Sequence, residues 1–257
     1  MTTIKEISDD HLVIPFIDLK RDDNLVKEIQ VILKKFGLYT FGPNDPDGKW
    51  GPNTETGLEQ FCDAVHLNCF DTGVFGPTFA EALLNTTAIS PIAPSRFALP
   101  TWWHGGDKNE LAAAVAKEGK DQGITNRNQW CYIMATIQHE TAHTYKPIAE
   151  FGGKNKSYAP YYGRGYVQLT HKFNYEKYGT LLNRDFVAHP DEVMDPTVSL
   201  FIIVHGMKHG TFTGKKLDDY TSGSQVDFLH ARRIINGMDC ADLIRGYAIS
   251  WQGTTAF

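Results

Sequence analysis

Apolar residues in the first ninety positions recur at helical spacing. A helix is expected from about Asn24 to Phe36, because five apolar side chains fall on one of its faces: Leu25, Ile29, Ile32, Leu33 and Phe36. A second helix is expected to begin at Pro52, since proline suits the first helical position. It turns three apolar side chains inward: Leu58, Phe61 and Val65. The segment before this helix, DGKWGPNT, is similar to the later segment TGVFGPTF, so a third helix is expected to begin at the second Gly-Pro. The pattern therefore predicts a three-helix bundle.

The rest of the chain is also expected to be largely helical. The Ala-rich segment ELAAAVAKEGK favours a helix, and further helices are expected over residues 128–144, 196–207 and 225–235. The last should stop at Asn236-Gly237, residues that suit a left-handed cap. A Pro- and Ser-bearing stretch after residue 89 indicates a linker. The predicted organisation is therefore a tail (1–19), a bundle (20–88), a linker (89–108) and a larger helical domain (109–257).

Composition narrows the classes of function. The chain has 257 residues, enough for one large or two small domains, and a net charge of −5. It shows no basic stripe; Lys34-Lys35, Lys215-Lys216 and Arg232-Arg233 are short pairs interpreted as solvated surface, so no nucleic-acid partner is expected. The N-terminal residues carry no secretion signal, so we expect synthesis in the cytoplasm. No stretch could span a bilayer, so no membrane insertion is expected. We also expect a monomer.

Four cysteines bear on the redox setting: Cys62, Cys69, Cys131 and Cys240. None forms a C-x-x-C pair, so a structural zinc site is not expected. Cys62 and Cys69 lie close enough to pair in an oxidising compartment. Buried free thiols are the favoured interpretation for a cytoplasmic product.

The segment HETAH, His139 to His143, has two incompatible interpretations. As H-E-x-x-H on a helix it matches the zinc peptidases, with two imidazoles one turn apart and a glutamate as base. That interpretation needs a third ligand, but Lys146 and Ala149 occupy the positions of the extended motif, and Glu176 has no supporting pattern. No metal or cofactor is therefore expected.

The other interpretation is a sugar-cleaving enzyme. Glu140 falls at the edge of an apolar helical stripe, where a carboxyl tends to hold its proton, as a general acid must. Glu150, just after the expected helix, supplies a second carboxylate. Inverting glycosidases separate two such groups by roughly 6.5–9.5 Å, which a helix residue and a loop residue can span.

Several motifs in order then resemble glycoside hydrolase family 19, which includes plant-type chitinases and endolysins. They run from about residue 128 to the C-terminus: HETA, PIAEFGG, YYGRGYVQLT, NYEKYG, GMKHGTFTGKKLDDY and ARRIINGMDCADLIRGYA. The resemblance implies a lysozyme-like helical catalytic domain. It implies that Glu140 is the general acid, Glu150 the base that activates water, and Thr170 a residue that holds this water.

The same resemblance implies a substrate site of polar and aromatic side chains. Gln168 and Asn174 match sugar-contacting positions, and Asn236 matches a substrate-site asparagine, with a helix cap as the equal alternative. Tyr162, with its neighbours in the motif, can stack on a sugar face. His139 is placed at this site too, with a structural hydrogen bond as its alternative role.

The N-terminal bundle resembles a peptidoglycan-binding module of cell-wall hydrolases. The matching segments are VKEIQVILKKFG, DGKWGPNTETGLEQF and DTGVFGPTFAEALL, although Cys62 replaces the usual Gln after the Phe. A packing or dimerisation domain is the alternative.

Together the resemblances predict a mainly α-helical, endolysin-like peptidoglycan hydrolase whose partner is peptidoglycan or a related N-acetylated glycan. It would reach the wall after release or delivery. The alternatives are a chitinase, a zinc peptidase and a non-catalytic wall-binding protein.

Overall fold

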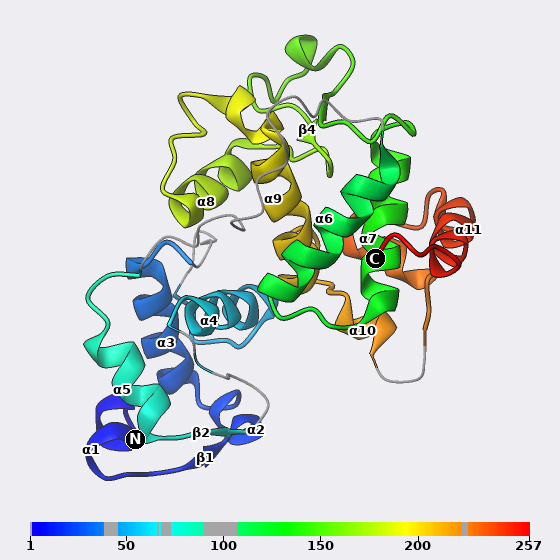
Figure 1. The fold of residues 1–257 in the computed structure, drawn as a ribbon. Coiled ribbons are helices and arrows are strands. Elements are labelled where there is room, and N and C mark those ends of the chain that lie inside the picture. The colour runs from blue at the N-terminus through cyan, green and yellow to red at the C-terminus, as the bar shows by residue number, and fades with distance from the viewer. Residues whose placement is uncertain (1, 39–45, 66, 68–72, 90–106, 223–225) are drawn as a thin grey trace. The chain divides into compact units, whose positions relative to one another are not determined.

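The computed structural model describes residues 2–38, 46–65, 67, 73–89, 107–222 and 226–257. The chain divides into two compact units, Met1–Ile92 and Ala93–Phe257, each mainly α-helical (Figure 1). The expected linker over 89–108 falls largely outside the described residues.

The N-terminal unit is built on three longer helices, as the apolar pattern predicts. They are α3 (Asp23–Lys35), α4 (Pro52–Ala64) and α5 (Pro77–Asn85). Proline occupies the first helical position of both α4 and α5, so each repeated Gly-Pro corner does start a helix. Leu58 and Phe61 are fully buried, whereas Val65 lies just beyond the end of α4 and is only partly buried.

Residues 2–19, expected to be a tail, are instead a folded part of this unit. They form α1 (Ile4–Asp9), β1 (Ile14–Pro15) and α2 (Phe16–Leu19). β1 pairs antiparallel with β2 (Val74–Phe75), and Phe16 packs edge-on against Phe75 and Phe79. The segment buries four apolar side chains that a solvated tail would expose: Ile4, Ile7, Phe16 and Leu19.

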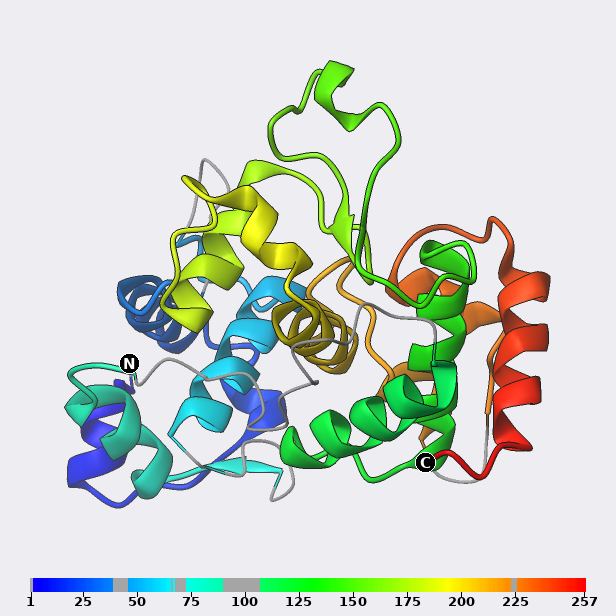
Figure 2. The ribbon, with the colours of Figure 1, turned by 45° about the horizontal axis from the view of Figure 1, so that its top comes forward.

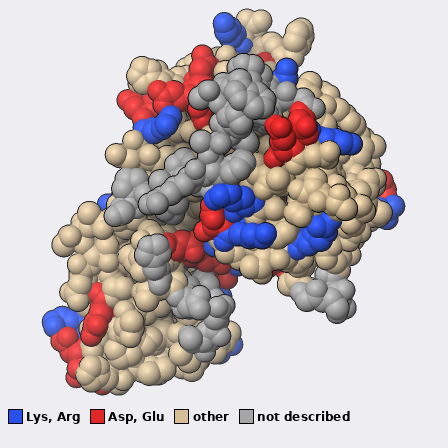
Figure 3. All heavy atoms as spheres, viewed as in Figure 1, with Lys and Arg blue, Asp and Glu red and all other residues tan. Residues whose placement is uncertain are grey.

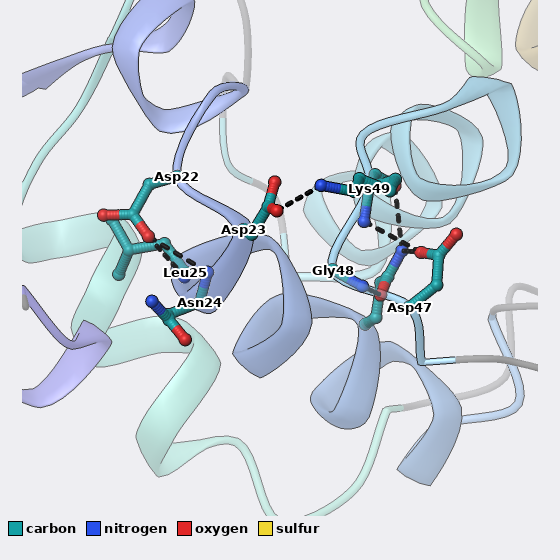
Figure 4. Close-up of polar contacts among 8 residues, drawn as sticks. Asp22, Asp23, Asn24, Leu25, Asp47, Gly48 and Lys49 are labelled. Carbon is teal, nitrogen blue, oxygen red and sulfur yellow. Dashed lines mark hydrogen bonds and ion pairs between the residues drawn. The ribbon is translucent and has the colours of Figure 1, made fainter.

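One buried glutamine holds the corner before α4. The Gln30 side-chain amide donates to Asp47 Oδ1 (3.0 Å), and its Oε1 accepts from Gly48 N (2.9 Å). Asp23, at the start of α3, forms an ion pair with Lys49 across the same corner (Figure 4). The corner is therefore fixed from a neighbouring helix as well as by its own residues, since the Lys49 N–H donates to Asp47 Oδ1 (2.8 Å).

The cysteines agree only in part with the interpretation as buried free thiols. Cys62 is disulfide-bonded. Cys131, buried, and Cys240, exposed, are free. The disulfide lies in the N-terminal unit.

The C-terminal unit is organised around α7 (Arg127–Glu140). It contacts α6 (Lys108–Asp121), α9 (Pro196–His209) and, most extensively, α11 (Ala241–Gln252). Every α7 residue from Gln129 to Ile137 is buried, so α7 is the core helix of the unit. Shorter elements complete the fold: β3 (Ile148–Ala149), η1 (Gly153–Asn155), β4 (Arg164–Gly165), α8 (Lys172–Leu182), η2 (Pro190–Met194), α10 (Asp218–Thr221) and η3 (His230–Ile234).

A long excursion leaves the C-terminal end of α7. It enters through β3 and returns through β4, its antiparallel partner, with Ile148 opposite Gly165 and Ala149 opposite Arg164. Between the two strands the chain projects from the unit and carries the short helix η1 (Figure 2). Glu150 begins this projection.

No described helix is long and apolar enough to cross a membrane.

Candidate active site

Glu140 is the last residue of α7, four residues before the expected end of the helix. The Thr141 hydroxyl donates back to the Ile137 carbonyl (2.7 Å) and closes the final turn. Ala142 (φ +48°) and His143 (φ +63°) then take left-handed backbone conformations that end the helix. The carboxyl of Glu140 therefore stands at a helix terminus.

A buried guanidinium contacts this carboxyl. Arg232 Nη1 donates to Glu140 Oε1 at 2.7 Å, and the side chains of Arg232 and Glu140 are only 3% and 16% exposed. Arg232 also contacts Asp239, through Nε to the carbonyl (3.2 Å) and Nη2 to Oδ2 (3.4 Å). The expected apolar setting of Glu140 is thus corrected to an ionic one.

Arg232 also differs from its interpretation in the sequence. The pair Arg232-Arg233 was expected on solvated surface, which holds for Arg233 alone. The segment is the 3₁₀ helix η3 rather than the predicted α-helix, and its two consecutive arginines point to different environments, as neighbouring residues of a helix do. The motif ARRIING carried no signal that told the two arginines apart.

The H-E-x-x-H segment does not form the predicted helical pair of imidazoles. His139 lies within α7, whereas His143 lies beyond its end, with Nε2 hydrogen-bonded to the Tyr247 hydroxyl of α11 (3.0 Å). Two histidines one helical turn apart are what a zinc peptidase requires. Across the described residues no group of three or more His, Cys, Asp or Glu side chains could hold a metal. His139 is partly buried, and its expected substrate role stays a prediction.

Glu150 is held by the two ends of the projecting loop. Its main-chain N–H donates to the Gly163 carbonyl (2.7 Å), and its carboxylate accepts from Gly163 N (3.1 Å) and the Tyr158 hydroxyl (2.9 Å). Lys156 Nζ lies 3.7 Å away. Burial opposes the charge, but the Gly163 N–H, Tyr158 and Lys156 outweigh it and lower the pKa of Glu150. An ionised carboxylate at neutral pH is the form that a general base needs.

Gln168, Thr170 and Asn174 form a hydrogen-bonded series linked to the same strand pair. Gln168 Nε2 donates to the carbonyls of Ile148 (2.9 Å) and Gly165 (3.1 Å). Thr170 Oγ1 donates to the Gln168 carbonyl (2.7 Å), and Asn174 Nδ2 donates to the Thr170 carbonyl (2.8 Å). Both Nε2 hydrogens of Gln168 are used, so Oε1 is its remaining group for a sugar donor. The structure therefore connects these three to the β3–β4 strand pair, while their contacts with water and sugar stay predictions.

Two of the three tyrosines of YYGRGY are buried, and Tyr161 is partly exposed. Tyr162 is 7% exposed and packs under the Arg164 guanidinium, 3.7 Å from its ring centroid, and Tyr166 is fully buried. The expected stacking role of Tyr162 stays a prediction, although its ring is buried here against Arg164.

Exposed aromatic surface lies elsewhere on the same excursion. Phe151, directly after Glu150, is fully exposed, and Phe173 is half exposed with His171 stacked on it (ring centroids 5.8 Å apart). Tyr158 meets His171 edge-on at 5.2 Å. Sequence reasoning missed Phe151 and Phe173; adjacency to Glu150 was the available signal for Phe151.

Asn236 is exposed and lies next to Arg232. Its N–H donates to the Arg232 carbonyl (3.0 Å), and its Oδ1 accepts from Gly237 N (2.9 Å). Neither Asn236 nor Gly237 has a positive φ, so the predicted left-handed cap is wrong. The substrate role of Asn236 stays a prediction, now beside the Glu140–Arg232 pair.

Two family models match parts of this chain. A family model for chitinase class I, the glycoside hydrolase 19 domain, matches residues 105–208. This part of the chain is therefore similar to chitinase class I. The match includes Glu140 and Glu150, whereas Arg232 and Asn236 lie beyond it. A model described as "Putative peptidoglycan binding domain" matches residues 22–83, so the N-terminal unit carries a peptidoglycan-binding module.

A curated relative agrees with the chitinase class I domain. The rice protein (Oryza sativa subsp. japonica) named Chitinase 11 is 38% identical over 91 residues. This alignment covers 30% of the present chain and 36% of the rice protein. The chain thus spans about a third of the relative's length.

Proposed function

We propose that this protein is a peptidoglycan hydrolase that cleaves β-1,4 glycosidic bonds of the cell-wall glycan with inversion. Glu140 protonates the leaving oxygen, and Glu150 removes a proton from the attacking water. Arg232, at 2.7 Å, stabilises the carboxylate that Glu140 becomes after proton transfer. The lowered pKa of Glu150 keeps it ionised as a base.

The observation that carries the proposal is the pairing of a chitinase class I domain with a peptidoglycan-binding module on one chain. The module raises the concentration of the enzyme at an insoluble wall. Mass analysis of products from purified sacculi, with NMR of the newly formed anomer, tests the proposal. We expect glycan fragments ending in inverted reducing sugars. Cleaved peptide bonds with intact glycan strands would exclude it.

A chitinase is the second candidate, because the rice relative bears that name. Chitin is a polymer of β-1,4 N-acetylglucosamine, and the same acid–base pair would cleave it. Comparing kcat/KM on chitin oligosaccharides and on soluble peptidoglycan strands separates the two substrates. We expect the higher value on peptidoglycan.

A zinc peptidase is not favoured, because His143 lies beyond α7 and contacts Tyr247. We expect full glycosidase activity in excess EDTA. A loss that added zinc restores would revive the metal-dependent interpretation.

We further propose that the protein acts on the wall outside the reducing cytoplasm, after release or delivery. The disulfide at Cys62 supports this proposal, since structural disulfides persist in oxidising compartments. Detection of the protein in wall fractions, with Cys62 oxidised on recovery, tests it.

A further inference from the structure

The segment from the end of α7 to the first turn of α8, residues 141–174, contains the excursion and is basic, whereas the whole chain is acidic. This segment has five cationic side chains and one carboxylate, that of Glu150; Glu140 and Glu176 lie just outside it. The full chain has a net charge of −5. A local excess of positive charge beside a candidate base favours an anionic ligand at that place.

Three of the five cations already have partners. Lys172 pairs with Glu176 (3.0 Å), Lys156 lies 3.7 Å from Glu150, and the buried Arg164 pairs with Asp191 (2.7 Å). These three contribute little net charge to an approaching ligand.

Lys146 and Lys154 are different. Both are exposed, and neither forms an ion pair with any residue that the structure describes. Lys146 precedes β3, and Lys154 lies in η1 at the end of the projection, where Lys and Arg atoms reach the surface at the top of Figure 3. The two lysines therefore flank Glu150 in sequence, one on each side.

The loop between β3 and β4 lies next to Glu150, where the substrate would bind. Gly163 binds both the main chain and the carboxylate of Glu150, so the excursion begins and ends at the candidate base. A glycan strand held at Glu150 brings its substituents against this excursion. Peptidoglycan carries short peptides on alternate sugars, and these stem peptides bear free carboxylates; chitin carries none.

We propose that Lys146 and Lys154 bind the stem-peptide carboxylates of peptidoglycan and favour this substrate over neutral glycans. This inference rests on the proposed function, because it assigns a specificity determinant to the same reaction. Exposed ion pairs are individually weak and are screened by salt. The contribution should therefore appear in KM, depend on ionic strength, and leave kcat nearly unchanged.

The test uses the full-length protein and two matched soluble substrates. One is glycan strands with their stem peptides, and the other is the same strands after an amidase has removed the peptides. The double variant Lys146→Gln/Lys154→Gln should raise KM about three- to ten-fold on stem-bearing strands and leave KM on stripped strands unchanged. Lys146→Arg/Lys154→Arg, which keeps both charges, should behave like wild type. Lys215→Gln removes another exposed lysine of the same unit and serves as the control.

The outcomes separate this inference from the proposed function. An equal KM rise on both substrates, or none on either, would overturn the role of the lysines. A loss seen only with whole sacculi would overturn it too, since the lysines would then bind another wall polyanion. Absence of wild-type cleavage of both soluble substrates would overturn the hydrolase proposal. Binding titrations in a Glu140→Gln background would then still decide whether the lysines distinguish stem-bearing from stripped strands.

Discussion

Glu140 and Glu150 lie ten positions apart in the sequence but are held in contrasting ways. Glu140 ends the buried helix α7 and receives its hydrogen bond from Arg232, 92 residues later in the chain. Glu150 begins an exposed loop and receives its hydrogen bonds from Tyr158 and Gly163, within 13 residues. The contacts of the Glu140 carboxylate therefore depend on assembly of the whole unit, and those of the Glu150 carboxylate depend on one local loop. Substitutions at the two positions should therefore have different effects on stability and activity.

The largest effect is expected from removal of the proposed acid. Glu140→Gln should lower kcat by about 10³-fold or more, because the leaving oxygen then departs without a proton. Glu176→Gln is the matched control, since Glu176 is an exposed carboxylate that pairs with Lys172 on the surface. Steady-state rates on soluble glycan, with circular dichroism to monitor the fold, make the measurement. Activity retained in Glu140→Gln would exclude it as the acid.

Removal of the proposed base should have a smaller effect. Glu150→Gln should lower kcat by about 10²-fold, because water still attacks, though more slowly, without a base. The melting temperature should stay close to the wild-type value, since the carboxylate belongs to a local exposed loop. A large fall in stability would contradict the proposed local character of this site.

Loss of the arginine should affect both stability and rate. Arg232→Met leaves the part-buried Glu140 carboxylate without its cation, so the free energy of unfolding should fall by about 2–3 kcal/mol and kcat by about ten-fold. Arg233→Met, the exposed neighbour, is the control and should change neither. Urea denaturation and steady-state kinetics check both quantities. An Arg232→Met protein as stable as its control would contradict the proposal that the contacts of Glu140 depend on assembly of the whole unit.

The smallest effect is a shift in pH dependence. The Tyr158 hydroxyl helps to lower the pKa of Glu150, so Tyr158→Phe should raise that pKa. Because a base must be ionised, activity falls as the pH drops through its pKa, and the acidic limb of kcat/KM should move to higher pH. Tyr161→Phe is the control, since Tyr161 contacts the Val187 carbonyl instead. An unchanged acidic limb of the kcat/KM profile in Tyr158→Phe would contradict the effect of Tyr158 on the pKa of Glu150.

The helices with regular apolar faces could be predicted from the sequence. α3 and α9 begin within one residue of the expected positions, and α4 begins at Pro52. Propensity and proline placement are local properties, so they are readable without the fold. The folded N-terminal segment also had a local signal, because Thr3 and Glu6 form a capping box around the start of α1.

The features that were missed depend on tertiary contacts. α7 ends at Glu140 because Ala142 and His143 adopt positive φ, which alanine does not indicate. α11 begins after Cys240 (φ +56°) without a side-chain cap, so its start carried no signal. The Glu140–Arg232 pair joins positions 92 residues apart, a distance that local patterns do not reach. The residue types of the site were readable from the sequence, but their partners were not.

The β3–β4 pair has a consequence for how this family can diversify. Glu150 is anchored to Gly163 where the projecting loop begins and ends, so the two strands clamp the loop at its base. Insertions or deletions near η1 would change the loop tip while the clamp keeps the main chain of Glu150 in place, and lengthening a surface loop costs little closure entropy. New tips could therefore be exchanged between relatives to match new wall chemistries without rebuilding the residue that activates water.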